Sequence, residues 1–125
     1  MKVWLAIGFL LTFPGVAFAA DATCKTPVGA CFSLHGRLSA YNGTPTYRIW
    51  PVGSHRLLGV YDDHGNAEPV LPAQVSEAIH GNAFGKAFYG DYEVCPMTKS
   101  IAGRMQMVCV KSVAHLTAQQ TPQPR

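Results

Sequence analysis

Hydrophobic and polar residues alternate along residues 32–41, which is the pattern of a β-strand with one buried face. The positions on the apolar side are Phe32, Leu34, Gly36, Leu38 and Ala40. Polar or aromatic residues occupy the positions between them. Because glycine tolerates a bend or bulge inside a strand, we expect this strand to coil sharply at Gly36.

Two turn signals then predict a three-stranded meander. A turn at residues 42–45 (Asn-Gly-Thr-Pro) places Leu38 opposite Ile49. A second turn at residues 53–54 (Gly-Ser) places Ile49 opposite Leu58. Both registers put apolar side chains on one continuous face, which a slip of one residue in either hairpin would destroy.

The next part of the chain predicts a loop, a helix and an aromatic segment. Residues 62–68 contain acidic and small residues, as is typical of a loop. Residues 72–80 have apolar positions on one side, with Pro72 suited to the first helical position and Gly81 suited to the end. We expect residues 84–89 to form a loop or short strand whose aromatic rings close one end of the core.

The last third of the chain predicts a second hairpin. Apolar and polar positions alternate around residues 92–97 and again around residues 105–111. Placing Cys95 opposite Cys109 also places Glu93 opposite Lys111, and Val94 opposite Val110. This agreement favours a cross-strand register with the two cysteines facing each other.

Cys24, Cys31, Cys95 and Cys109 predict two disulfide bonds in an exported protein. The hairpin register favours a Cys95–Cys109 bond, which leaves Cys24 to pair with Cys31. A Cys31–Cys95 bond stays open as an alternative, because Cys31 begins the first strand. The four cysteines lack the close paired spacing of a structural zinc site.

The beginning of the chain has the features of a signal peptide. Lys2 precedes an uncharged apolar run, and residues 17–19 (Ala-Phe-Ala) fit the small-residue requirement of signal peptidase. We therefore predict cleavage after Ala19 and a periplasmic or secreted protein. The apolar run is shorter than a membrane span requires, and Pro14 interrupts it, so we expect no membrane span after cleavage.

Composition limits the function classes further. The chain has 125 residues, 14% of them charged, and a net charge of +3. Removing 19 of the 125 residues leaves 106 and takes away Lys2 but no acidic residue, so the charge falls from +3 to +2. Such a chain predicts one domain at residues 31–116, preceded by an N-terminal segment at 20–30 and followed by a disordered tail at 117–125. A polybasic nucleic-acid-binding arm is excluded.

The predicted order of three strands, a short helix and two strands resembles the OB-fold, a small five-stranded Greek-key β-barrel with its helix between strands three and four. Four segments are also similar to uncharacterised small exported proteins of bacteria: HGRL at 35–38, YNGTP at 41–45, RIWPVG at 48–53 and DYEVCP at 91–96. This resemblance implies export and a compact mainly β domain, and it carries over no activity.

The predicted register gathers basic and aromatic residues on the outer face of the meander. We call this set the basic–aromatic strip; its members are His35, Arg37, Tyr41, Arg48, Trp50, His55 and Tyr61. In one interpretation, Arg37 and Arg48 stack on Trp50 and cover it. In the other, the strip binds a ligand, because OB-folds use this face for oligonucleotides and oligosaccharides.

The expected function is a non-enzymatic binding module for an envelope glycan, peptide or protein, with a purely structural envelope role as the rival. Export disfavours intracellular nucleic acid, and the small charge disfavours long polyanions. No nucleophile motif or metalloprotease motif is found in the sequence, so we expect no enzyme activity and no cofactor.

Copper binding is a further alternative. A soft cluster for monovalent copper would consist of Met97, Met105 and Met107 with Cys95 and Cys109, if these are reduced. The competing interpretation is that the methionines fill space beside a disulfide. His35 and His55 supply only two metal ligands and would need a third, such as His64.

Overall fold

The computed structural model describes residues 24–61 and 71–121. It contains five β-strands and one α-helix, in the order that the sequence predicts. The elements are β1 (Phe32–Ala40), β2 (Tyr47–Pro51), β3 (Leu58–Val60), α1 (Ala73–Ile79), β4 (Lys86–Pro96) and β5 (Met107–Gln120). The expectation of a mainly β fold with one short helix between strands three and four is confirmed.

Both predicted registers of the meander are confirmed. Leu38 of β1 lies opposite Ile49 of β2, and Ile49 lies opposite Leu58 of β3. All three side chains are buried, because the registers bring the apolar positions of the three strands to the same face. Gly36 lies opposite Pro51 in β2, at the point where a side chain would collide with the core.

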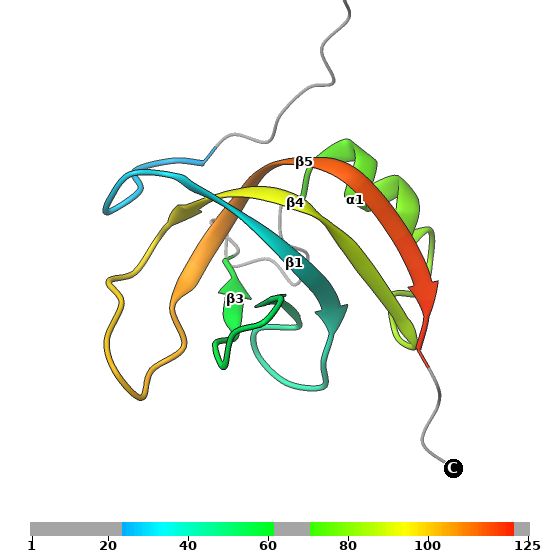
Figure 1. The fold of residues 1–125 in the computed structure, drawn as a ribbon, viewed down its shortest axis with the longest axis horizontal. Helices are drawn as coiled ribbons and strands as arrows, with labels where there is room; N and C mark the ends of the chain where they lie inside the picture. Colours follow the sequence, from blue (N-terminus) through cyan, green and yellow to red (C-terminus); the bar gives the residue numbers. More distant parts are fainter. Residues whose placement is uncertain (1–23, 62–70, 122–125) are drawn as a thin grey trace, which may run out of the picture.

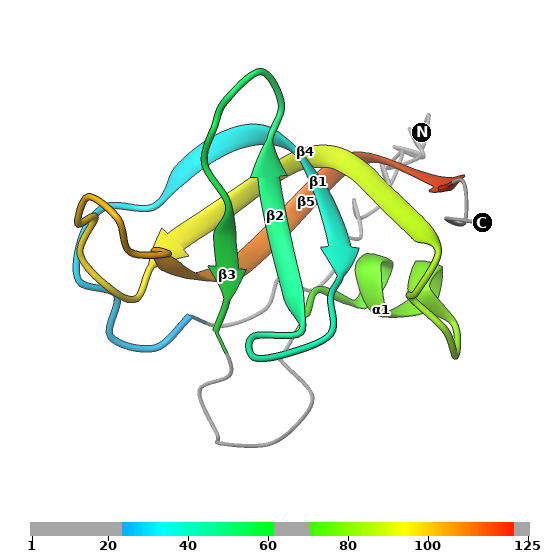
Figure 2. The same ribbon diagram turned by 90° about the horizontal axis from the view of Figure 1, so that it is seen from below.

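The strand pairings close on themselves. β4 pairs antiparallel with both β1 and β5, and β3 pairs in parallel with β5. The resulting order is β1-β2-β3-β5-β4, with β4 returning to β1. Figure 1 shows β1, β4 and β5 running across the molecule with α1 beside β5, and Figure 2, a view from below, shows β2 and β3 in front.

The core lies between the strands and beneath α1. Tyr92 and Phe88 of β4 are its largest fully buried side chains, and Val75 of α1 joins them. The hydroxyl group of Tyr92 donates a hydrogen bond of 2.7 Å to the backbone oxygen of Phe88. This bond satisfies the polar end of the ring inside the core, where burial raises the pKa of the Tyr92 hydroxyl above its usual value.

The predicted helix is found, with small differences at its ends. Pro72 is the N-cap rather than the first helical residue. His80 takes a left-handed conformation with φ of 35°, and Gly81 follows with φ of 92°, so the helix ends where glycine was expected to end it. The aromatic segment is split: Phe88 is in the core, whereas Phe84 is 50% exposed and does not close it.

The expected disulfide pairing is wrong. Cys24 is bonded to Cys109 and Cys31 is bonded to Cys95. Cys95 does lie opposite Cys109 in the β4–β5 register, as the sequence predicts. The facing position alone does not decide the bond, because β4 also pairs with β1, and Cys31 directly precedes β1.

The pairing between β1 and β4 explains the observed bond. Phe32 lies opposite Val94 in this antiparallel pair, so the preceding position brings Cys31 to Cys95. This is the alternative that the sequence left open. Cys24, from the segment before β1, then takes the remaining cysteine of β5.

The second hairpin differs from its predicted form in register and in length. The register shifts between Glu93 and Val94, so Glu93 lies opposite Ser112 instead of Lys111. The Lys111 ammonium nevertheless reaches the Glu93 carboxylate at 3.5 Å. β5 continues to Gln120, pairing with the first residues of β4, so the disordered tail expected from residue 117 is wrong for residues 117–120.

Candidate functional site

Arg37 and Trp50 form the centre of the basic–aromatic strip. They are directly opposite each other in the β1–β2 pair, and the Arg37 guanidinium carbon lies 4.8 Å from the centroid of the Trp50 ring. The indole N–H of Trp50 donates a hydrogen bond of 2.8 Å to the backbone oxygen of Ser54. The cation–π contact and this bond together fix the orientation of the ring.

Arg48 does not stack on Trp50, which corrects one expectation. Its guanidinium carbon lies 4.7 Å from the centroid of the Tyr41 ring, and its Nε donates to the backbone oxygen of Pro45 at 3.0 Å. The turn after β1 brings Tyr41 and Pro45 to Arg48, so the contacts of this arginine stabilise that turn. Neither Arg48, Tyr41 nor Tyr61 lines the cavities described next.

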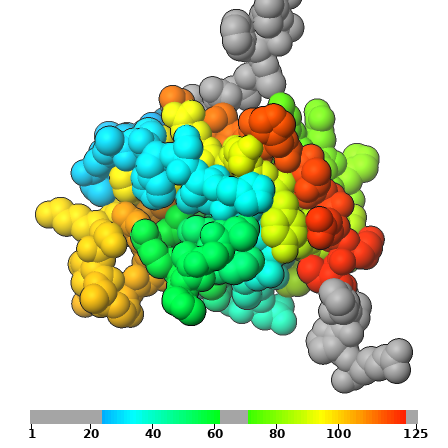
Figure 3. All heavy atoms as spheres, in the orientation of Figure 1, coloured from blue at the N-terminus to red at the C-terminus, as the bar shows by residue number. Residues whose placement is uncertain are grey.

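Two adjoining cavities lie beside the strip. The larger, of about 480 Å³, lies between residues 55–57 of the β2–β3 connection and residues 100–106 of the β4–β5 connection. The smaller, of about 300 Å³, shares residues 55–57 and adds Arg37 and Trp50. We call the two together the groove. Figure 3 shows the β4–β5 connection, in gold, projecting beside the green β2–β3 region.

The described lining of the groove has positive charge and no acidic side chain. Arg37, Arg56 and Arg104 line it, together with His55. Arg56 donates to the side-chain oxygen of Gln106 at 2.7 Å, which is a neutral acceptor. Leu57, Ile101 and Met105 contribute apolar surface, and Ile101 is 49% exposed.

Arg37 has no hydrogen-bonding or ion-pairing partner among the described residues. Its Nε is buried and unpaired, and its guanidinium carbon lies over the Trp50 ring. A buried polar group without a partner is costly and calls for an explanation in a native protein. This unpaired Nε belongs to a residue that lines the smaller cavity.

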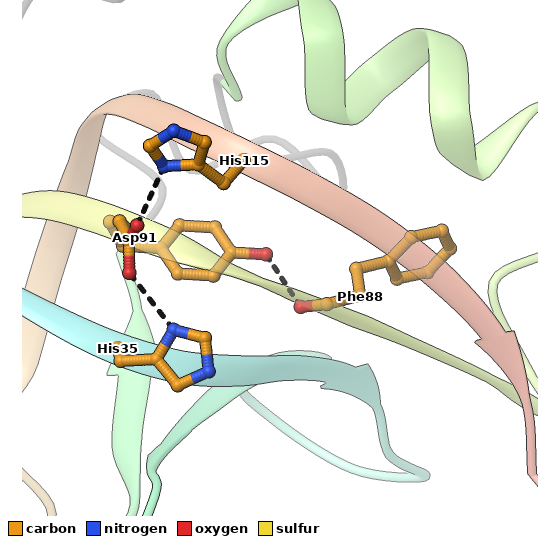
Figure 4. A network of polar contacts seen from close by, with 5 residues as sticks. His35, Phe88, Asp91 and His115 are labelled. Carbon is orange, nitrogen blue, oxygen red and sulfur yellow. Dashed lines mark hydrogen bonds and ion pairs between the residues drawn. The ribbon is translucent and has the colours of Figure 1, made fainter.

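A second polar cluster, the His–Asp–His bridge, consists of His35, Asp91 and His115 from β1, β4 and β5. The Nδ1 of His35 lies 2.9 Å from one oxygen of Asp91, and the Nδ1 of His115 lies 2.8 Å from the other (Figure 4). These hydrogen bonds, the one from His35 first, hold the pKa of the Asp91 carboxyl below its ordinary value of 3.8. The carboxylate thus joins three strands on the outer face.

A β-bulge positions His115. The β4–β5 register shifts between Tyr89 and Asp91, and His115 has φ of 54° at this point. A non-glycine residue is strained in this conformation, and a bulge re-aims a side chain. The ring is therefore directed to Asp91 rather than to the core.

Of the seven residues of the basic–aromatic strip, Arg37, Trp50 and His55 line the groove, and His35 belongs to the His–Asp–His bridge. His35 contacts Asp91 rather than His55. Arg56, Ile101, Met105 and Arg104 of the groove were missed, since a strand register gives no information about which connections lie side by side. Asp91 and His115 were missed too, although a β1–β4 register would have revealed the first.

The described residues give little support to the hypotheses of metal binding. All four cysteines are in disulfides, so no thiolate joins the methionines. In the described ranges no three His, Cys, Asp or Glu side chains are placed to hold a metal ion. The Sδ atoms of Met105 and Met107 pack against Gly59, as the space-filling interpretation expects. The third ligand suggested above, His64, lies outside the described residues.

No protein-family model, curated protein or solved structure matches the chain. Within residues 24–61 and 71–121, no helix has the length and apolar character needed to cross a membrane.

Proposed function

We propose that the protein is an exported, disulfide-stabilised binding module whose ligand occupies the groove beside Trp50. The ligand is an envelope glycan, peptide or protein, and the role is non-enzymatic. The observation that carries this proposal is the Arg37 guanidinium, which is held against Trp50 at 4.8 Å at the wall of a cavity and lacks a partner within the described residues.

The stacking contact pre-organises Arg37 for binding. A free arginine side chain must lose rotamer freedom when it binds, and this loss opposes affinity. The Trp50 ring, itself fixed by its bond to Ser54, already restrains the Arg37 side chain. A ligand that accepts hydrogen bonds from the guanidinium then gains the charge-assisted bonds at a lower entropic cost.

The ring of strand pairings supports an OB-like barrel as the finer description of the fold. The meander of β1–β3, the parallel β3–β5 pair and the return of β4 to β1 agree with that topology. Export is supported by the apolar leader at residues 1–19 and by two disulfides, which form and persist in oxidising compartments.

A non-enzymatic role agrees with the surroundings of the His–Asp–His bridge. Each imidazole is bonded to Asp91, and within the described residues neither has a second hydrogen-bond partner such as a serine hydroxyl. Covalent catalysis by a side-chain nucleophile needs a base within hydrogen-bond reach of that nucleophile. We therefore assign the bridge to joining the three strands.

Site-specific photo-crosslinking in the native envelope tests this function. The full chain carries a benzophenone side chain at Ile101, which is 49% exposed in the groove, or at Val28, which is 54% exposed and outside it. We expect an adduct of defined mass from position 101 and none from position 28, and loss of that adduct with Arg37→Ala. Equal adducts at both positions, or none at position 101, would support the structural envelope role instead.

A further inference from the structure

We propose that the ligand of the groove is an acidic peptide segment with aliphatic side chains between its carboxylates. This inference rests on the proposed function and names the chemistry of the ligand. It follows from the distribution of charge and apolar surface along the groove, and from the way in which Trp50 is already covered.

Charge complementarity is the first step. Arg37, Arg56 and Arg104 line the groove, and no carboxylate lines either cavity. Arg104, like Arg37, has no ion-pair partner among the described residues, and the guanidinium of Arg56 donates to the neutral side chain of Gln106. The acidic residues of the described part that form ion pairs, Asp91 and Glu93, pair with other groups. The groove thus presents three cations to an anionic ligand.

The apolar surface between the cations indicates that the ligand also carries aliphatic side chains. Leu57, Ile101 and Met105 line the larger cavity together with Arg56 and Arg104. Ile101 is 49% exposed and Met105 is 37% exposed, so both present apolar area to solvent. Covering this area removes it from water, which favours binding. A segment that carries only charge would leave this contribution unused.

The position of Arg37 over Trp50 favours a peptide over a carbohydrate as the ligand. Sugar rings and bases bind on the free face of an aromatic side chain. The cation of Arg37 lies over the Trp50 ring, and this arginine also lines the smaller cavity. The groove therefore offers a guanidinium in front of the indole, and the remaining apolar contacts come from aliphatic side chains. This surface fits carboxylates and aliphatic side chains better than it fits a stacked sugar.

Intrinsic fluorescence measures the binding of a probe peptide. The sequence holds two tryptophans, Trp4 and Trp50, and Trp4 belongs to the leader that we propose is removed on export. Trp4→Phe also excludes a signal from uncleaved chain, so the fluorescence reports from Trp50 alone. The probe is a short synthetic peptide in which Glu and Leu alternate. Its matched control has Gln in place of every Glu. We expect saturable binding of the acidic peptide that weakens as salt is raised from about 0.05 to 0.3 M, and no binding of the Gln peptide.

Paired charge-removing variants locate the binding. Arg56→Gln with Arg104→Gln removes two cations of the groove and is expected to weaken the acidic peptide by about tenfold. Lys86→Gln with Lys111→Gln removes the same charge outside the groove and is expected to leave the affinity within about twofold. Thermal unfolding of each variant checks that the fold is intact.

Several results would overturn the inference. If the Gln peptide bound as tightly as the acidic peptide, the carboxylates would have no role in binding. If both pairs of variants weakened the acidic peptide equally, binding would depend on the net charge of the protein and not on the groove. Tighter binding of an oligogalacturonate than of the peptide would assign the groove to a carbohydrate. In each case an adduct at position 101 would still support the proposed function. The absence of that adduct would overturn both the proposed function and the inference of an acidic peptide.

Discussion

The Nδ1 of His35 and the Oδ1 of Asp91 are 2.9 Å apart, across the β1–β4 pair in which the two residues are direct register partners. Two register positions further along, and so on the same face, Arg37 lies opposite Tyr89. The basic–aromatic strip therefore does not end at the edge of the meander, because the β1–β4 pair continues its outer face onto β4. His115 extends the polar contacts to β5.

The pKa of Asp91 predicts a specific pH dependence of stability. A carboxyl group whose pKa is lower in the folded than in the unfolded state stabilises the fold above its unfolded pKa, and this stabilisation is lost as the pH falls through the folded pKa. For Asp91 the pKa is lowered from 3.8, mainly by the hydrogen bond to His35. We expect the free energy of unfolding to fall below about pH 4, and Asp91→Asn to reduce that slope.

Urea unfolding at a series of pH values from about 2.5 to 6 measures the effect. Glu77→Gln is the matched control, because Glu77 lies on exposed surface of α1 and forms no ion pair in the described part of the chain. An Asp91→Asn protein with the same slope as the wild type would show that the His–Asp–His bridge does not form in solution.

The disulfide connectivity makes a second prediction. Proteolysis without reduction is expected to release peptides joined through Cys24–Cys109 and Cys31–Cys95. Mass spectrometry distinguishes these from the pairing that the hairpin alone suggests. The bonds join residues separated by 85 and 64 positions, so loop-closure entropy predicts a loss of about 4 kcal/mol when either pair is replaced by serine.

If proteolysis released a peptide joined through Cys95–Cys109 instead, Cys95 would not be bonded to Cys31 at the start of β1, which would contradict the pairing of β1 with β4 at that end. Urea unfolding of the two serine double variants supplies the stability measurement. Comparable losses are expected from both, because the entropy depends only on the logarithm of the loop length.

Much of the fold follows from local patterns, and the reasons are visible in individual residues. The alternation along residues 32–40 and two short turns determine that Leu38, Ile49 and Leu58 share a row, since period and turn length leave no other register that buries them. The β1–β4 pair has no turn to connect it, so nothing local determines its register. That pair decides both Cys31–Cys95 and His35–Asp91.

In the groove too, local patterns determine some contacts and the closure of the whole sheet determines others. Arg37 and Trp50 are direct partners within a hairpin, and the sequence predicts their contact. Arg104 reaches the groove because the β4–β5 connection lies beside the β2–β3 connection, which depends on the closure of the whole sheet. His115 depends on a bulge, where one extra residue reverses the direction of a side chain.

Gly36 gives a third prediction, about packing. A Cβ atom at this position would lie 2.6 Å from Cδ1 of Leu34 and 2.7 Å from Cγ2 of Ile49, which is fully buried. Overpacking of a filled core costs about 1–3 kcal/mol. We expect Gly36→Ala to lose stability in this range in urea unfolding, whereas Ser39→Ala, on the outer face of the same strand, changes it by less than about 0.5 kcal/mol.

The Arg37–Trp50 contact gives the last prediction, which separates a covering role from a binding role. If Arg37 only covers the ring, Arg37→Ala removes a half-buried cation–π contact with the indole, and binding in the groove is unchanged. If it binds the ligand, the variant loses about 0.5–1 kcal/mol of stability from the same contact but loses most of the affinity. We expect the second pattern.

Two measurements on one variant therefore decide the matter. Thermal unfolding of Arg37→Ala gives the stability, and Trp50 fluorescence in the Trp4→Phe background gives the affinity for the acidic peptide. Arg48→Ala is the matched control, because Arg48 makes the same kind of contact with Tyr41 at 4.7 Å but lies outside the groove. Arg48→Ala also loses the hydrogen bond to Pro45, so its loss of stability is expected to be at least as large as that of Arg37→Ala. A loss of affinity in Arg37→Ala alone then assigns the unpaired guanidinium to the ligand, since the stacking contact is common to the two arginines and the cavity is not.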